Sequence, residues 1–283
     1  MTTRTRSELF LLSITLIWGS TFVTSKYLLD SISPLIFIGV RFAVATVVFA
    51  FLFPRKVLHA PRGSWLKGGI LGVLLFIGFA TQTVGLQYTG ASKSAFITGM
   101  MVVFTPLCQL LIERRAPKVG NIIGILMVTL GLYFLTSPSG SEFNLGDGLN
   151  VICALTFGFY IVYLDVFSKE HDAVHLTMAQ FVTCTVLGLA SASLFETVRF
   201  APSAGGVMAL VYLIIFATII ALFVQNRYQK DTTPTRSAVI FSIEPVLAAG
   251  FAYVLLGEVL GVLGLLGGAM IVGGVLVSEL SPG

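Results

Sequence analysis

Lys93-Ser94-Ala95 and Arg236-Ser237-Ala238 decide the fold, because each triplet opens a long apolar run and the two lie 143 positions apart. Further residues recur at the same spacing or, earlier in each half, at a spacing of 139. The matches are Gln82 with Gln225, Gly124 with Gly267, Met127 with Met270, Gly131 with Gly274, Trp18-Gly19 with Phe157-Gly158, and Arg41-Phe42 with Gln180-Phe181. Near-constant spacing over matching apolar runs predicts two structural repeats.

The composition indicates a membrane protein. Hydrophobic residues make up 56% of the 283 residues and charged residues only 11%, whereas a soluble domain carries about 25% charged residues. The mean hydropathy is +0.95. A spanning helix needs about 20 apolar residues, so ten spans would use roughly 200. The remainder leaves short loops and no room for a soluble catalytic domain.

Hydropathy, together with proline and glycine breakers, divides the chain into ten apolar segments. The runs are continuous and longer than barrel strands, which favours helices that satisfy their own backbone groups in lipid. The predicted segments are 9–29, 34–53, 67–88, 92–112, 119–136, 147–168, 174–195, 206–228, 235–256 and 260–279.

The basic residues predict the orientation of these segments. Of the 17 Lys and Arg residues, Lys26, Lys93 and Arg199 fall on one side, and Arg41 lies within a segment. The rest fall on the other side: Arg4, Arg6, Arg55, Lys56, Arg62, Lys67, Arg114, Arg115, Lys118, Lys169, Arg227, Lys230 and Arg236. Cytoplasmic loops carry the excess of Lys and Arg. We therefore expect both termini and the loops 54–66 and 113–118 in the cytoplasm, with 137–146 and 196–204 outside.

Five segments per repeat is an odd number, so the second repeat must run inverted relative to the first. The sequence thus predicts an all-α membrane protein with ten transmembrane helices in two inverted five-helix repeats, residues 1–140 and 141–283. Inverted repeats are common in transporters, because two equivalent halves can exchange roles and open one site to either side.

The chain resembles the EamA type of the drug/metabolite transporter superfamily over its whole length. The residues that carry the resemblance are Ile17-Trp18-Gly19-Ser20-Thr21-Phe22, Arg41-Phe42, Gly90-Ala91-Ser92-Lys93-Ser94-Ala95-Phe96, Glu244-Pro245-Val246 and Leu256-Gly257-Glu258. The resemblance implies ten helices, a central cavity between the halves, and transport of amino acids, nucleotide-sugar-like compounds or other small metabolites. It also implies a place in the cell (inner) membrane, and export is common in bacterial members.

The leading interpretation is a secondary transporter, and an exporter, of a small organic metabolite such as an amino acid, working by alternating access. The alternatives are a membrane-embedded lipid flippase and a facilitative channel-like carrier. We expect no enzymatic activity, no cofactor, no metal and no nucleic-acid partner. The expected partners are the substrate, the lipid bilayer, a coupled proton and a second copy of the chain. The glycine-patterned segments 119–136 and 260–279 are expected to be packing helices or a dimer face, outside the transport path.

Polar groups inside membrane segments are candidates for function, because their burial in lipid is costly. Glu244 lies near the middle of a segment and precedes Pro245, so a carboxylate stands beside a broken hydrogen-bond ladder. It could exchange a proton or meet a cationic group, or it is a neutral packing residue. Arg41 could attract a substrate carboxylate, or it forms a structural ion pair or a helix-cap contact.

Other candidates complete the predicted substrate site. Gln82 and Gln225 occupy matched positions and could donate hydrogen bonds from both halves, or simply join helices. The polar Thr98 and the aromatic Trp18, Phe22, Phe157 and Tyr160 are further candidates; the alternative for the aromatic residues is packing or contact with lipid.

Pro106 and Pro245 are the predicted hinges. Twelve positions separate Ser94 from Pro106 but only eight separate Ser237 from Pro245. The extra four residues correspond to about one helical turn. The two segments are therefore expected to bend at different depths, which departs from two-fold equivalence.

Overall fold

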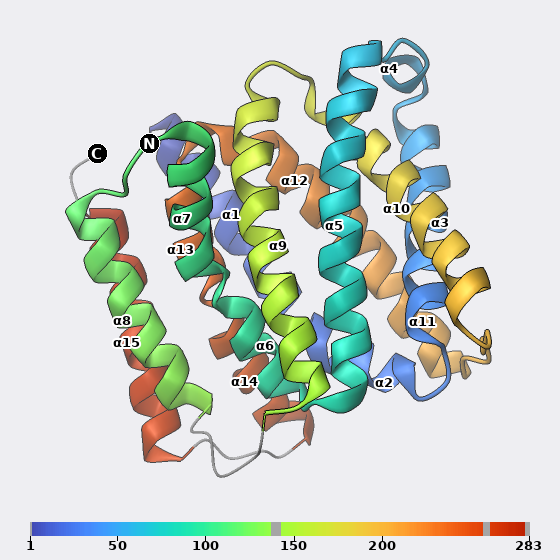
Figure 1. Ribbon diagram of the computed structural model, residues 1–283. Coiled ribbons are helices and arrows are strands. Elements are labelled where there is room, and N and C mark those ends of the chain that lie inside the picture. Colours follow the sequence, from blue (N-terminus) through green and yellow to red (C-terminus); the bar gives the residue numbers. More distant parts are fainter. Residues whose placement is uncertain (1, 137–142, 257–260, 281–283) are drawn as a thin grey trace.

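The computed structural model describes residues 2–136, 143–256 and 261–280, and all regular elements within these ranges are helices (Figure 1). Each predicted apolar segment coincides with a helix or an interrupted helix. In the first half these are α1 (Thr3–Gly19), α2 (Thr21–Leu29), α3 (Pro34–Leu52), α4 (Pro54–Leu58), α5 (Arg62–Tyr88), α6 (Ala91–Gly99), α7 (Met101–Glu113) and α8 (Val119–Thr136). The short α4 lies in a stretch that the sequence predicts to be a loop.

The second half follows the same order. Its elements are α9 (Leu145–Ser168), α10 (Ala173–Phe195), α11 (Ala204–Tyr212), the π-helix η1 (Leu213–Ile220), α12 (Ala221–Tyr228), the 3-10 turn η2 (Gln229–Asp231), α13 (Pro234–Phe241), α14 (Glu244–Leu256) and α15 (Val262–Leu280). Gly257 and Glu258, which belong to one of the motifs above, lie outside the described residues, as do residues 137–142 of a predicted outside loop.

Seven helical stretches of the described chain are long and apolar enough to cross a membrane, judged by length and composition. They are Thr3–Leu29, Pro34–Leu52, Arg62–Tyr88, Ala91–Glu113, Leu145–Ser168, Ala173–Phe195 and Ala204–Asp231. Val119–Phe134 and Val262–Ser278 are shorter apolar helices. The stretches run up and down through one bundle, and α1 begins at the same end where α15 finishes (Figure 1).

Helix starts follow local capping chemistry. Asn144 caps α9 by accepting a hydrogen bond from the N–H of Asp147, whose carboxylate accepts from the N–H of Asn144 in return. Asp172 and Ser203 cap α10 and α11 through their side-chain oxygens. Pro34 begins α3, where its missing N–H leaves no hydrogen bond unmade. The sequence thus sets these boundaries within a few residues of the apolar pattern.

The fourth and ninth segments are interrupted at equivalent positions, Met100 and Ile243, which lie 143 residues apart. The N–H of Met100 donates to the Ile97 carbonyl (3.1 Å), and the N–H of Ile243 donates to the Ile240 carbonyl (3.2 Å). The next helix then begins with matching bonds, from Val103 to Met100 (2.9 Å) and from Val246 to Ile243 (3.0 Å).

The equivalent positions of the two breaks correct the expectation that the fourth and ninth segments bend at different depths. Pro245 follows directly on one break, but α7 continues through Pro106, which lies six residues beyond the other. A proline removes one backbone donor, and a helix can pass through it with a bend. The two-fold relation between the halves is therefore kept at the breaks even though the prolines do not match.

Helices α8 and α15 pack against each other at the edge of the bundle (Figure 1). Gly124 lies against Gly274, and Gly131 lies against Gly267: a Cβ on Gly124 would be 2.7 Å from the Gly274 carbonyl oxygen. Such small residues let two helices approach closely in a membrane. This matches the prediction that the glycine-patterned segments are packing helices.

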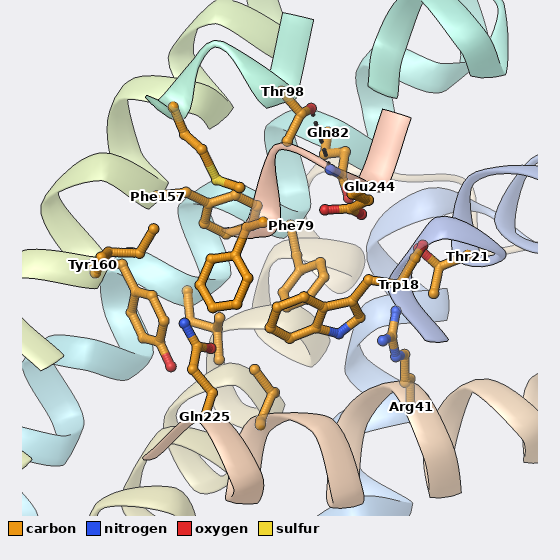
Figure 2. Close-up of a pocket in the computed structure, with 15 residues that line it drawn as sticks. Trp18, Thr21, Arg41, Phe79, Gln82, Thr98, Phe157, Tyr160, Gln225 and Glu244 are labelled. Carbon is orange, nitrogen blue, oxygen red and sulfur yellow. Dashed lines mark hydrogen bonds between the residues drawn. The ribbon is translucent and has the colours of Figure 1, made fainter. Parts of the chain in front are cut away.

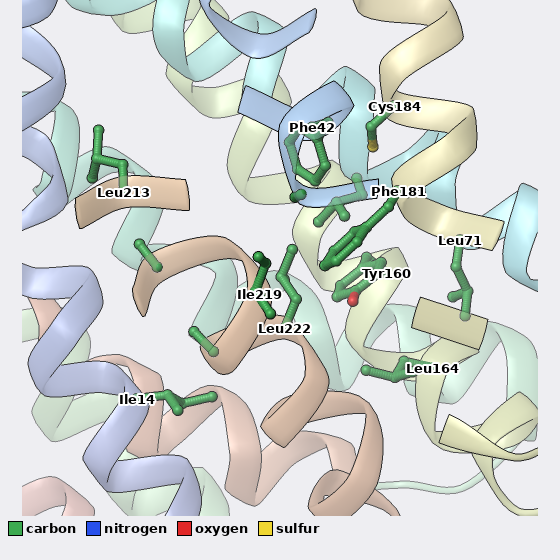
Figure 3. Close-up of a cluster of buried hydrophobic side chains, with 14 of the residues drawn as sticks. Ile14, Phe42, Leu71, Tyr160, Leu164, Phe181, Cys184, Leu213, Ile219 and Leu222 are labelled. Carbon is green, nitrogen blue, oxygen red and sulfur yellow. The ribbon is translucent and has the colours of Figure 1, made fainter. Parts of the chain in front are cut away.

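The main hydrophobic core joins α3, α9, α10 and the interrupted helix from α11 to α12 (Figure 3). Phe181 is fully buried and contacts Phe42 and Phe49, with ring centroids 5.8 and 5.5 Å apart. The cysteines Cys108, Cys153 and Cys184 are buried and unpaired, and Cys184 packs within this core (Figure 3). The core holds the helices that surround the cavity described next.

Candidate functional site

A cavity lies between the two halves of the chain (Figure 2). Its volume, taken as the space open to the centre of a water molecule, is about 60 Å³. The lining residues are Trp18, Thr21, Arg41, Leu75, Phe79, Gln82, Thr98, Met101, Phe157, Tyr160, Ile161, Leu222, Gln225, Phe241 and Glu244. They come from the first four segments and from the sixth, eighth and ninth; α8 and α15 contribute none of them.

Most of these lining residues form repeat-equivalent pairs. At a spacing of 139 the pairs are Trp18 with Phe157 and Thr21 with Tyr160, and at a spacing of 143 they are Phe79 with Leu222, Gln82 with Gln225, Thr98 with Phe241, and Met101 with Glu244. The cavity is thus built twice from the same helix positions. The two ionisable lining residues, Glu244 and Arg41, have no ionisable counterpart in the other repeat. Glu244 corresponds to Met101, and Arg41 corresponds to Gln180, which is not among the lining residues.

Arg41 enters the cavity from α3 and is only 3% exposed. Its Nε donates to Thr218 Oγ1 (2.5 Å), and its guanidinium lies 5.1 Å from the centroid of the Phe79 ring. Phe37 and Phe42 are at 5.9 Å. Planar aromatic faces attract a guanidinium, so these rings hold Arg41 in place without a neutralising carboxylate. The ion pair considered from the sequence is absent among the described residues.

The π-helix η1 places two groups of this site. In its wider turn, Thr218 Oγ1 donates to the Leu213 carbonyl five residues back (2.9 Å) and also accepts from Arg41. The neighbouring Ala217 carbonyl accepts a hydrogen bond from the indole Nε1 of Trp18 (3.1 Å). Short π-helices are rare and often mark functional positions. Here η1 fixes two side chains that line the cavity, Arg41 and Trp18.

Glu244 begins α14, directly after the break at Ile243. Within the described chain, its carboxylate makes no ion pair or side-chain hydrogen bond, and it lines the cavity. The N-terminal end of a helix favours a negative charge. Gln82 donates to Thr98 Oγ1 (3.3 Å) beside it (Figure 2). Glu244 is therefore placed to meet a group that enters the cavity.

The other glutamine takes part in a buried polar network. Gln225 Nε2 donates to Gln229 Oε1 (2.9 Å), and Gln229 Nε2 donates to the Ile161 carbonyl (2.7 Å). The Tyr160 hydroxyl donates to Gln180 Oε1 (2.9 Å). These bonds join α9, α10, α12 and η2, so on this side the polar side chains hold helices together.

Phe22 does not line the cavity. It is 2% exposed and packs with Leu29, Leu86, Ala95 and Ala248 in a small cluster. Its position one residue after Thr21 turns it by about 100° around the helix axis. The other eight candidates, Trp18, Arg41, Gln82, Thr98, Phe157, Tyr160, Gln225 and Glu244, converge there; their binding of substrate stays a prediction.

Several lining residues are absent from the predicted set, namely Thr21, Leu75, Phe79, Met101, Ile161, Leu222 and Phe241. Most of them lie three or four positions from a predicted residue. Leu75, Phe79 and Gln82, for example, share one face of α5. Residues at this spacing lie on the same side of a helix, so extending each candidate along its own helix face would have found them. Pro106 and Pro245 do not line the cavity, although Pro245 packs on Gly99 at the paired break.

Comparisons with known proteins assign the chain to a family. The EamA-like transporter family matches residues 5–137 and again residues 144–280. A protein of Archaeoglobus fulgidus named an uncharacterized transporter is 34% identical over 98% of this chain and 87% of its own length. The S-adenosylmethionine/S-adenosylhomocysteine transporter of Chlamydia muridarum is 24% identical over 86% of this chain and 81% of its length.

The fold is also found in a solved structure. A crystal structure aligns with a TM-score of 0.80 at 18% identity, and the alignment covers 98% of this chain and 97% of the chain in that structure.

The inner membrane transporter YedA of Escherichia coli, itself uncharacterized, is a further relative by sequence. It is 27% identical over 86% of this chain and 77% of its own length. With its apolar helices and two family matches, the chain is a multi-pass membrane transporter with two EamA repeats, and it belongs to the EamA-like transporter family.

Proposed function

We propose that this protein is a secondary transporter, and an exporter, of a small zwitterionic metabolite such as an amino acid or a related compound. The substrate binds in the cavity between the halves and is released by alternating access. In this proposal ten helices cross the membrane as two inverted repeats, residues 1–140 and 141–283, with both termini in the cytoplasm of a cell whose inner membrane holds the protein.

The observation that carries the proposal is the pair of opposite charges in an otherwise two-fold cavity. Arg41 and Glu244 lie toward the side of Trp18 and Thr21, and Phe157 and Tyr160 lie on the opposite side (Figure 2). A guanidinium binds a carboxylate, and a carboxylate binds an ammonium group. An α-amino acid carries both groups at one end, which leaves its side chain for the aromatic walls.

One relative supports the same substrate class. The transporter of Chlamydia muridarum is named for S-adenosylmethionine and S-adenosylhomocysteine, and both compounds carry an α-ammonium and an α-carboxylate group. Glu244 adds a titratable group in the transport path, so a proton that exchanges there supplies a coupling ion. The exposed outer faces of α8 and α15 are the surface proposed for a homodimer.

The test is transport by the purified protein in liposomes with no other component. We expect radiolabelled zwitterionic amino acids to exchange across the membrane, and Arg41→Gln, which installs the residue found at the equivalent position 180, to lower the rate about 10- to 100-fold, as for loss of a charged hydrogen bond. Movement of a fluorescent phospholipid instead would indicate a flippase. Flux that does not saturate with substrate concentration would indicate a channel-like carrier. Either result would reject the proposal.

A further inference from the structure

A buried cluster ties the two halves together where α9 begins. Asp147 is 0% exposed and accepts hydrogen bonds from Lys93 Nζ (2.7 Å) and Thr89 Oγ1 (3.0 Å). The backbone N–H of Asn144 adds a third bond (2.9 Å). Asp147 belongs to the second repeat, whereas Thr89 and Lys93 belong to the first. We call Asp147, Lys93 and Thr89 the Asp147 cluster.

A second cluster lies where α1 begins. Glu8 accepts a hydrogen bond from Thr232 Oγ1 (2.9 Å) and lies 3.6 Å from Arg236 Nη1. Arg4 also donates to it, from the preceding turn of α1 (2.8 Å). Glu8 belongs to the first repeat, whereas Thr232 and Arg236 belong to the second. We call Glu8, Arg236 and Thr232 the Glu8 cluster.

The two clusters are repeat-equivalent. Glu8 and Asp147 are 139 positions apart, and Thr89 and Lys93 precede Thr232 and Arg236 by 143, which are the spacings that also relate the cavity walls. The clusters lie at opposite ends of the bundle: α9 and α6 begin at the lower end of Figure 1, and α1 and α13 begin at the upper end. Each end of the path between the halves is therefore bridged by an acid from one repeat and a base and a threonine from the other.

Such bridges resist opening. When the halves separate at one end, the acid of that end loses its contacts with the base and the threonine of the other repeat, and hydrogen bonds to charged groups are stronger than those between neutral groups. The halves cannot open at either end without breaking the cluster there. The clusters thus act as two latches on one cavity.

One buried hydrogen bond of the Asp147 end has no equivalent at the Glu8 end. Next to Lys93, Ser94 donates to Asn150 Oδ1 (2.7 Å), and Asn150 in turn donates to the Gly146 carbonyl (2.7 Å). The equivalent serine at the other end is Ser237, but the position equivalent to Asn150 is Leu11. Within the described chain, the buried Ser237 Oγ has no hydrogen-bond partner. The Glu8 end therefore lacks a bond that the Asp147 end makes.

The packing differs in the same direction. At the Asp147 end, Gly85 and Gly146 bring two backbones together: a Cβ on Gly85 would lie 2.9 Å from the Gly146 carbonyl oxygen. The equivalent residues at the other end are Tyr228 and Ser7, neither of which is a glycine. There the contact is made by side chains, as in the bond from Ser7 Oγ to Asp231 Oδ2 (2.8 Å).

We infer that the Asp147 and Glu8 clusters are the two latches of alternating access and that the Glu8 latch is the weaker, so the empty protein opens first at the Glu8 end. The charge distribution predicts that this end faces the cytoplasm, where an exporter takes up its substrate. This inference rests on the proposed function, because it assumes that the halves rock about the cavity.

The test measures access to the cavity from each side without measuring transport. Thr21→Cys serves as the reporter, in a chain whose buried Cys108, Cys153 and Cys184 are replaced by alanine. A membrane-impermeant methanethiosulfonate cation is applied to right-side-out and to inside-out vesicles, and the labelling rate is recorded for each side. In the reporter chain itself we expect faster labelling from the Glu8 side.

Two isosteric variants then break one latch each. We expect Asp147→Asn to raise the labelling rate about tenfold from the Asp147 side only, and Glu8→Gln to raise it about tenfold from the Glu8 side only; a tenfold change in the open population corresponds to about 1.4 kcal/mol. Equal changes from both sides would overturn the inference, and so would no change in either variant.

A second pair of variants tests the asymmetry and does not touch an ion pair. Leu11→Asn supplies Ser237 with the partner that Ser94 has, and Asn150→Leu removes that partner from Ser94. We expect Leu11→Asn to slow labelling from the Glu8 side and Asn150→Leu to speed it from the Asp147 side. Monodisperse elution on size exclusion confirms that each variant is folded. If neither Leu11→Asn nor Asn150→Leu changed its labelling rate, the assignment of the weaker latch would be wrong. This result does not depend on whether amino acids are the substrate.

Discussion

Met101 and Glu244 occupy equivalent positions just after the paired helix breaks, and both line the cavity, but only Glu244 has an ionisable side chain. A two-fold cavity of apolar and amide side chains has no preferred end. The carboxylate of Glu244, with Arg41 on the neighbouring wall, gives the cavity a preferred end. The polarity of the site thus depends on two residues that depart from the repeat.

The first prediction concerns the charge of Glu244. Glu244→Gln keeps the size and hydrogen-bonding capacity of the side chain and removes its charge. We expect it to lower the transport rate about 10- to 100-fold, as for the loss of a charged hydrogen bond of about 1.5–3 kcal/mol, and to remove the dependence of transport on pH. Flux in liposomes and monodispersity are measured on the same preparation.

The control for this variant is Glu170→Gln, which removes an exposed carboxylate from the loop after α9 and should transport at the parental rate. If Glu244→Gln is folded and transports like the parent at every pH, Glu244 is a packing residue.

The second prediction concerns the α8 and α15 interface. Gly124→Ala would place a Cβ 2.7 Å from the Gly274 carbonyl oxygen, so the helices must move apart. We expect a loss of about 1–3 kcal/mol of stability, as for other overpacked interiors, seen as a lower thermal unfolding temperature in detergent.

Gly268→Ala, on the same helix pair, is the matched control. Its nearest neighbour, Val246 Cγ1, would be 3.7 Å away, an ordinary contact, and alanine raises helix propensity by up to about 1 kcal/mol. This variant should unfold at the parental temperature or above it. Equal losses in both variants would argue against close approach at Gly124.

The third prediction concerns pH and a loop outside the membrane segments. Partial burial acts to raise the pKa of Asp172, but hydrogen bonds from Lys56 Nζ (2.8 Å) and from the Val174 N–H (2.8 Å), with the charge of Lys56, hold the pKa below its usual value. A lowered pKa in the folded state stabilises the fold at pH values above the unfolded pKa of about 3.9, and this stabilisation is lost as the pH falls through the folded pKa.

Asp172→Asn keeps the cap acceptor and removes the charge. At pH 7 we expect it to be less stable than the parent by about 0.2–1 kcal/mol, the usual size of an exposed ion pair. The difference should be constant from pH 7 to about 5 and should shrink below about 4. Thermal unfolding in detergent across this range measures it. A difference that grows on acidification would contradict the assigned sign.

The fourth prediction concerns orientation. In a chain without its native cysteines, an impermeant maleimide should label Thr197→Cys in intact cells and Arg115→Cys only after lysis, because the Lys and Arg distribution places residues 113–118 in the cytoplasm. Both positions are exposed. The reverse pattern would invert the topology.

Much of the architecture follows from the sequence, because hydropathy and a constant spacing are local or pairwise signals. The apolar runs predict the helices to within a few residues, and the spacing of Gln82 from Gln225 predicts that they face each other across the cavity. Residue type alone does not predict which face of a helix a side chain occupies: Phe22 is aromatic like Trp18, but it packs in a cluster away from the cavity.

Other features depend on tertiary contacts that no local pattern encodes. Pro106 suggested a break that lies instead at Met100, because a helix can pass through one missing donor when the neighbouring turns are packed. The bond from Arg41 to Thr218 is made between the halves, and Thr218 lies in the π-helix Leu213–Ile220. The sequence of either half alone does not show this bond.

The latches also bear on how such a chain arose. Glu8 and Lys93 lie in one repeat, and Asp147 and Arg236 lie in the other, so each repeat carries its own acid and its own base. Two identical copies of a single repeat, inserted in opposite directions, would form both ion pairs by symmetry, as in an isologous dimer. The ends of this cavity thus carry the same pattern of ion pairs that a self-complementary antiparallel homodimer would have. The residues Leu11, Asn150 and Glu244 depart from this pattern and make its two ends unequal.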